Sequence, residues 1–153
     1  MGAGATFAFN QARMHGYRAA LEAAGVDVPD GYVRSGTSRH QGGMAGGAVL
    51  LDLPQRPTAI VAATDEVAAG VVEAARVKIL RVPEDLSIVG FDDTEFARLL
   101  SPPLTTVRQP LREMGRVALR TALRLAAGEQ LDSHHVELAT ELVVRSSTAP
   151  PPS

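Results

Sequence analysis

A chain of 153 residues is long enough to fold as one domain with a sizeable core. Its 45% hydrophobic and 21% charged content is ordinary for a soluble globular protein. The net charge of −2 and the pI of about 6.1 argue against a self-sufficient DNA-binding domain, which usually has a basic face. Aromatic residues make up only 4% and there is no Trp, which argues against a stacking platform for bases.

The sequence contains no cysteine, which excludes disulfides, thiol catalysis and thiolate metal sites. This composition fits a cytoplasmic location. The sequence shows neither a secretory signal nor an apolar run long enough to span a bilayer, so we expect no membrane partner.

The first predicted element is a helix. Apolar and small residues recur at helical spacing over 11–24, and Gly25 suits the position after a helix end. Before this helix Phe7 and Phe9 alternate, which is compatible with a short edge strand.

A glycine-rich segment comes next. The pair 32–33 indicates the start of a strand, and a Gly, Ser and Thr loop then leads into a helix predicted over 41–53. Each glycine in this helix costs about 1 kcal/mol of helix propensity, so we expect a weak helix.

Strands and helices alternate in the middle of the chain. The apolar run 57–63 predicts a buried parallel strand, a helix follows over 66–77, and 86–91 predicts a second strand. Right-handed crossovers place the strand ends at one sheet edge, so we expect Asp65 and Asp92 to lie on that edge. The pattern predicts an α/β fold, a three-layer structure with a mostly parallel sheet flanked by helices.

The remaining elements are a short helix, a strand, a long helix and a last strand, predicted over 95–100, 104–107, 111–127 and 136–144. The long helix has one apolar side, and arginines recur every four residues from Arg108 to Arg124. We interpret that row as a solvated face rather than a contact for an acidic partner. The proline-rich residues 149–153 predict a disordered tail.

Carboxylates follow two of the predicted strands, where open α/β sheets hold their ligands. Asp65 is better explained as a cap of the next helix than as a ligand contact. Asp92 suits both roles equally from its position alone. We interpret Asp93 as a structural group that holds the following loop.

No other pattern predicts chemistry. The adjacent His134 and His135 would face opposite sides of a strand, and we interpret all four histidines as solvated. A magnesium site at Asp92, Asp93 and Glu95 would need further carboxylates or phosphates. No phosphate loop or nucleophile elbow appears. We therefore expect no enzymatic activity, no metal and no cofactor.

Several motifs occur together and in one order: Ala12-Arg13-x-x-Gly16-Tyr17, Pro57-Thr58-Ala59-Ile60, VPEDLSIVGFDDTE over 82–95, PPLTTVRQP over 102–110, and Glu141-Leu142-Val143-Val144-Arg145-x-Ser147-Thr148. With them the chain resembles the lactose-repressor (LacI/GalR) family of bacterial transcription regulators along nearly its whole length. That family resembles periplasmic sugar-binding proteins, with two subdomains preceded by a helix-turn-helix.

The resemblance implies a domain assignment. Residues 1–148 would form the C-terminal part of an effector-binding and dimerisation domain, and the helix over 111–127 would cross into the other subdomain. We expect the helix-turn-helix and the first subdomain half to lie outside this chain.

The resemblance also implies an effector site of Arg13, Thr64 and Asp92. A sugar-like or nucleoside-like effector offers vicinal hydroxyls, from which Asp92 accepts hydrogen bonds while Arg13 donates in a fork. The chain departs from the family pattern at Thr64, where Asn is common, at Ser38, where an aromatic residue is common, and at Ile79, where Gly is usual.

In relatives the subunit contact maps to Ala68, Ala69, Val72 and Leu100, so we expect a homodimer. The implied function is the effector-sensing and dimerisation part of an allosteric transcription regulator that reads operator DNA only through its helix-turn-helix. The alternatives are a stand-alone sugar-binding protein and a small α/β enzyme with Asp92 as base. The missing signal peptide disfavours the first, and the missing nucleophile and cofactor motifs disfavour the second.

Overall fold

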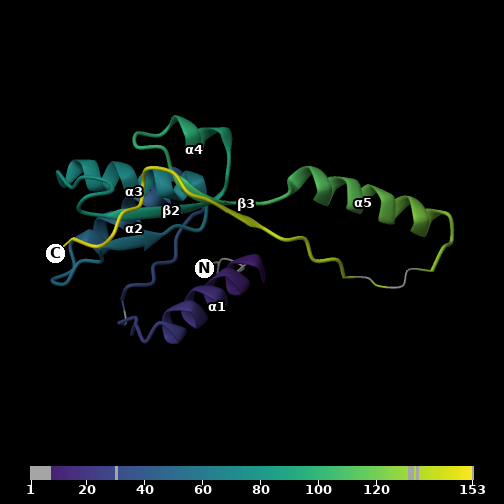
Figure 1. The fold of residues 1–153 in the computed structure, drawn as a ribbon, viewed down its shortest axis with the longest axis horizontal. Coiled ribbons are helices and arrows are strands. Elements are labelled where there is room, and N and C mark those ends of the chain that lie inside the picture. The colour runs from purple at the N-terminus through teal and green to yellow at the C-terminus, as the bar shows by residue number, and fades with distance from the viewer. Residues whose placement is uncertain (1–7, 30, 131–132, 134, 153) are drawn as a thin grey trace, which may run out of the picture.

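The computed structural model describes residues 8–29, 31–130, 133, 135 to 152 (Figure 1). In chain order the elements are α1 (Ala8–Ala23), α2 (His40–Leu51), β1 (Ala59–Val61), α3 (Asp65–Val77), β2 (Ser87–Asp92), α4 (Glu95–Leu99), β3 (Thr105–Arg108), α5 (Leu111–Ala126) and β4 (Glu141–Val143). The α/β fold expected from the sequence is confirmed.

Three local predictions were wrong. Residues 32–33 lie in irregular structure rather than in a strand, and the last strand covers only Glu141–Val143 of the range 136–144. Phe9 belongs to α1 rather than to an edge strand, while Phe7 lies outside the described residues.

The sheet has the order β1-β2-β3-β4. The first three strands run parallel, with Ile60 opposite Ile88 and Gly90 opposite Thr106, and β4 pairs antiparallel with β3. The expectation of a mostly parallel sheet is therefore confirmed, and the parallel strands end at a common edge.

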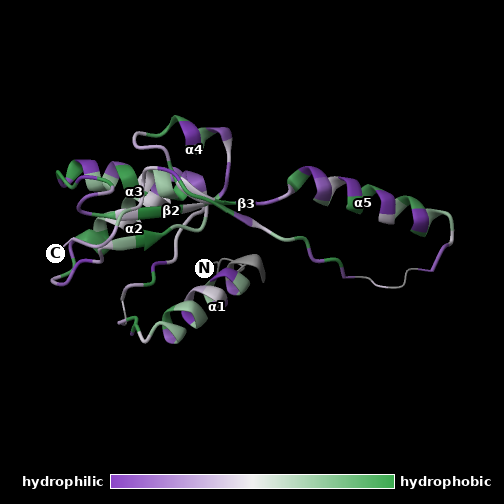
Figure 2. Ribbon diagram, viewed as in Figure 1, coloured by the Kyte–Doolittle hydropathy of each residue, from purple (hydrophilic) through white to green (hydrophobic). Residues whose placement is uncertain are grey.

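A hydrophobic core lies between α3 and the sheet. Its fully buried members include Ala68, Leu86, Ile88 and Leu104. Figure 2 shows apolar colour on β2 and along part of α3. The continuous apolar runs in the sequence are thus the faces that meet here.

Helix α2 packs on α3 through glycines. A Cβ atom added to Gly43 would lie 2.0 Å from the carbonyl oxygen of Val67, and one added to Gly70 would lie 2.1 Å from that of His40. The glycines that lower the helix propensity of α2 are therefore the residues that allow the two backbones to approach. The helix forms because this packing offsets the propensity loss.

Helix α3 ends in a left-handed residue. Ile79 has φ +57°, and it follows the C-cap residue Lys78. The N–H of Leu80 donates to the carbonyl of Ala75 at 2.9 Å, which satisfies an end carbonyl of the helix. A β-branched residue thus adopts the conformation that normally selects glycine.

Helix α5 projects away from the sheet (Figure 1) and has no buried residue. Leu119 and Leu123 are each 63% exposed, and the helix shows alternating polar and apolar colours in Figure 2. Two of its arginines make local ion pairs, Arg116 with Glu113 and Arg124 with Glu129. The predicted amphipathic helix is confirmed. Its apolar side is covered only in part: Val117 is half-buried, and Val136 and Leu138 line a pocket together with it.

In the described ranges no helix is long and apolar enough to cross a bilayer. Among those same residues no group of three or more His, Cys, Asp or Glu side chains could hold a metal ion.

Candidate functional site

Arg13 connects α1 to the carboxyl ends of β1 and β2. Its guanidinium lies 3.6 Å from the ring centroid of Phe91, and Nη1 donates to the carbonyl of Ala63 at 2.5 Å. Nη2 lies 3.9 Å from Oδ1 of Asp92. Burial lowers the pKa of Arg13, and the charge of Asp92 opposes that effect. The side chain therefore closes the edge at which the two strands end.

Asp92 ends β2 with φ +113°, a conformation that L side chains rarely adopt. Its side chain is 26% exposed, and its Oδ1 accepts a hydrogen bond of 2.6 Å from Nε2 of Gln109. Burial raises the pKa of Asp92, and the Gln109 hydrogen bond and the Arg13 charge act in the opposite direction. A strained, partly desolvated carboxylate thus stands at the sheet edge.

Thr64 is the N-cap of α3. Its hydroxyl accepts a hydrogen bond from the N–H of Val67 at 3.2 Å, so Asp65, which was predicted to cap this helix, is not the capping residue. Thr64 directly follows Ala63, whose carbonyl binds Arg13. The structure therefore brings Arg13 and Asp92 into contact, with Thr64 one residue from the Arg13 contact.

Asp65 is completely buried and fastens the loop after β2. Its carboxylate accepts hydrogen bonds from the N–H of Thr94 at 2.7 Å and from the hydroxyl of Thr106 at 2.5 Å. A Cβ on Gly90 would lie 2.5 Å from Asp65 Oδ1, which explains the glycine inside β2. Burial leaves Asp65 no exposed surface for a ligand.

Asp93 is structural, as interpreted from the sequence. Its side chain is 2% exposed, and Oδ2 accepts a hydrogen bond from Nε of Arg108 at 2.6 Å, while Oδ1 pairs with Arg145. Burial by itself would raise the pKa of Asp93, but the hydrogen bonds from Arg145 and Arg108 outweigh it and hold the pKa below its usual value. The loop that follows Asp92 is therefore held twice, by Asp65 through Thr94 and by the ion pairs of Asp93.

Gln109 is the site residue that the sequence analysis missed. It directly follows β3, as Asp92 ends β2, and the strands are parallel neighbours. The rule that ligands gather beyond the ends of parallel strands would have selected it. In the sequence this glutamine stands out only as part of the motif PPLTTVRQP over 102–110.

The residues expected at a subunit contact differ in exposure. Ala68 and Ala69 are buried within this chain, at 0% and 4% exposure, so they offer almost no surface to a partner. Val72 and Leu100 are half-buried, and the neighbouring Leu99 is 76% exposed. A contact on this side would therefore use α4 and the outer part of α3.

The matching family model is the periplasmic binding protein-like domain, which aligns with residues 4–148. The regulator DegA of Bacillus subtilis is 42% identical over 138 residues, and the ribose operon repressor of Escherichia coli is 37% identical over 135 residues. The alignments cover 90% and 88% of this chain, and the chain spans 41% of the length of each relative. The CelR–cellobiose complex has a TM-score of 0.83 at 37% identity, over 88% of this chain and 41% of that one.

Proposed function

This chain belongs to the periplasmic binding protein-like family, which includes LacI-type transcription regulators, and we propose that it senses a small sugar-like effector for a regulator of this type. The effector would bind at Arg13, Thr64 and Asp92. Residues 1–148 would form the C-terminal part of the effector-binding and dimerisation domain, with α5 as the helix that crosses to the other subdomain.

The pair of Arg13 and Asp92 at the sheet edge carries this proposal. The carboxylate accepts hydrogen bonds and the guanidinium donates them, so vicinal hydroxyls of a sugar match both. Charge-assisted hydrogen bonds of this kind contribute on the order of 1.5–3 kcal/mol each. The cellobiose-bound relative CelR supports a sugar as the ligand class.

The proposal extends to partners. Homodimerisation would use Val72 and Leu100 together with the exposed surface of α4, and operator DNA would be read by a helix-turn-helix outside these residues. Effector binding would change DNA affinity through a coupling free energy of about 1–3 kcal/mol. The regulator would act in the cytoplasm.

A thermal-shift screen tests the effector assignment. Ribose, glucose, cellobiose and hypoxanthine are titrated into the chain, and one of them is expected to raise the melting temperature. A ligand at 100 times its dissociation constant adds about 2.7 kcal/mol of stability. The shift should disappear in Asp92→Ala.

Asp27→Ala is the matched control, because Asp27 is an exposed carboxylate that is not one of the proposed site residues. It should keep the full shift. A ligand whose stabilisation survives in Asp92→Ala would rule out the proposed site, and light scattering that finds a monomer at micromolar concentration would rule out the dimer.

A further inference from the structure

Gln109 and Arg13 meet at the same carboxylate oxygen. Nε2 of Gln109 donates to Oδ1 of Asp92 at 2.6 Å, and Nη2 of Arg13 lies 3.9 Å from that oxygen. A hydroxyl that approaches Oδ1 therefore competes with the shorter of these two contacts. The glutamine amide therefore occupies the position from which a polar ligand would donate a hydrogen bond to Oδ1 of Asp92.

The Gln109 hydrogen bond also fixes how the Asp92 side chain points. The backbone that follows Asp92 is held separately, since Thr94 donates to buried Asp65 and Asp93 pairs with Arg108. Asp92 itself directly precedes these anchored residues and has a positive φ. Its carboxylate is thus oriented by the side chain of the residue that follows the neighbouring strand.

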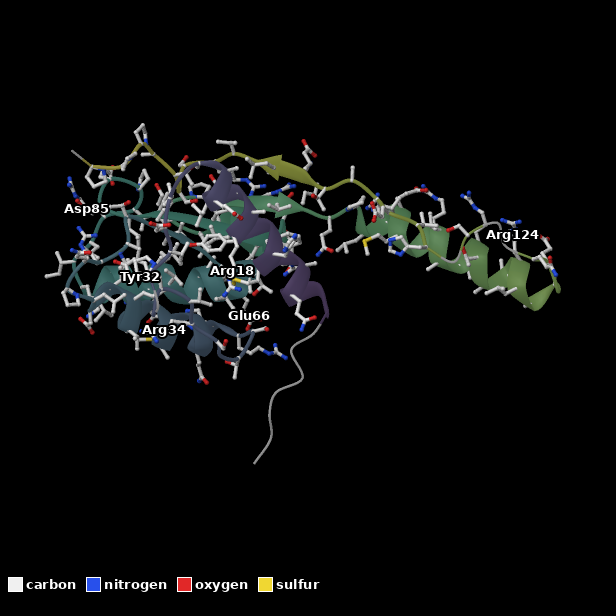
Figure 3. All side chains as sticks on the ribbon, turned by 90° about the horizontal axis from the view of Figure 1, so that it is seen from below. Arg18, Tyr32, Arg34, Glu66, Asp85 and Arg124 are labelled. Atoms are coloured by element: carbon white, nitrogen blue, oxygen red, sulfur yellow. The ribbon has the colours of Figure 1, made fainter. Side chains whose placement is uncertain are left out.

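The position of Gln109 in the chain links Asp92 to α5. Arg108 ends β3 opposite Asp92, and Pro110 is the N-cap of α5. The hydrogen bond to Asp92 holds the Gln109 side chain at the sheet edge, immediately before the chain leaves the sheet (Figure 1). No residue of the following helix α5 is buried. Figure 3 shows the same helix from below, extending from the sheet edge with Arg124 near its far end.

We infer that Gln109 is a positioning residue that presets Asp92 and transmits the state of that carboxylate to the joint at the base of α5. A ligand hydroxyl that takes the Oδ1 position releases the Gln109 amide, and the 109–110 joint then gains freedom. The role in transmission rests on the proposed function, whereas the presetting of Asp92 does not.

The first test measures the pKa of Asp92 by NMR titration of its carboxyl carbon, with no ligand present. Loss of the donated hydrogen bond in Gln109→Met should raise the pKa of Asp92 above its value in the unchanged chain. Gln130→Met, at an exposed position after α5, should leave it unchanged. A merely structural role of Gln109 would not move this value selectively, and an Asp92 pKa that stays constant in Gln109→Met overturns the inference.

The second test follows the α5 joint. The chain has no cysteine, so Val77→Cys and Ala122→Cys give one spin label on exposed α3 surface and one on α5. Electron-electron distance measurements should show a broader distribution when Gln109→Met is added. Gln109→Asn keeps the amide but is one methylene too short, and it should broaden the distribution in the same way.

Identical distance distributions in the unchanged chain and both Gln109 variants would overturn the transmission role. Circular dichroism confirms that each variant is folded before the comparison is made. Neither test uses a sugar, so a negative thermal-shift screen and a failure of this inference are separate outcomes.

Discussion

The α2–α3–sheet unit and the α5 arm are both predicted by helical or strand periodicity, yet they differ in what surrounds them. In the first, Leu86, Ile88 and Ala68 are each 0% exposed. In the second, Leu119 and Leu123 are 63% exposed, although polar and apolar colours alternate along α5 in Figure 2. Amphipathic patterning shows that a helix has an apolar side, but it does not show what covers that side.

This contrast has an energetic consequence. Stability in the first unit depends on contacts between residues far apart in sequence, whereas in the described residues α5 depends mainly on local hydrogen bonds and ion pairs. Substitutions should therefore have large effects in one region and small effects in the other. The following predictions test this difference, from the largest expected effect to the smallest.

The α2–α3 contact should give the largest effect. Gly43→Ala places a methyl group against the backbone of Val67 and should destabilise the chain by roughly 3 kcal/mol or more, measured by urea unfolding. Gly46→Ala is the matched control, because its Cβ would lie 3.7 Å from the nearest atom, Cβ of Arg34. That variant should gain up to about 1 kcal/mol of helix propensity. Similar effects at both glycines would show that packing does not explain them.

The Asp93 cluster should give the next effect. Asp93→Asn removes the charge that pairs with Arg145 and Arg108 and should cost roughly 3 kcal/mol at pH 7. The folded pKa of Asp93 lies below the usual 3.8, so its stabilisation is present above that pH and is lost as the pH falls through the lowered value.

Urea unfolding at pH 7 and at pH 3 checks the sign of this effect. The difference in unfolding free energy between Asp93→Asn and the unchanged chain should narrow at the lower pH. A difference that widens under acid would contradict the assignment of Asp93 as a charged anchor.

The end of α3 should respond in the stabilising direction. Ile79 holds a left-handed conformation at φ +57° and is 90% exposed, so Ile79→Gly removes strain and loses little packing. We expect a gain of about 1 kcal/mol in thermal unfolding. Ile79→Asn should give a smaller gain in stability. A loss of stability in both variants would show that the backbone at Ile79 is not strained.

The smallest effect is expected on α5. Leu119→Ser changes an exposed side chain and should alter the unfolding free energy by less than about 0.5 kcal/mol. Leu86→Ala in the core is the comparison and should cost about 2–5 kcal/mol. A large cost for Leu119→Ser would mean that the apolar side of α5 is buried in solution, for instance against a second copy of the chain.

Much of the fold follows from the sequence alone. Apolar runs and helical spacing identified the helices and the parallel strands, because these patterns depend on residues that are neighbours in the chain. The rule for strand ends then directed attention to Asp92, and the family motifs added Arg13 and Thr64. Their use as an effector site remains a proposal.

Other features were decided only by the tertiary structure. Asp65 and Thr106 are 41 residues apart, and only the packing of neighbouring strands turns a predicted helix cap into a buried acceptor. Gln109 likewise reaches Asp92 across a strand pair, and Gly43 matters because another helix lies against it. Local patterns determine which elements form, while the choice of partner for each side chain depends on distances that exist only after those elements have packed.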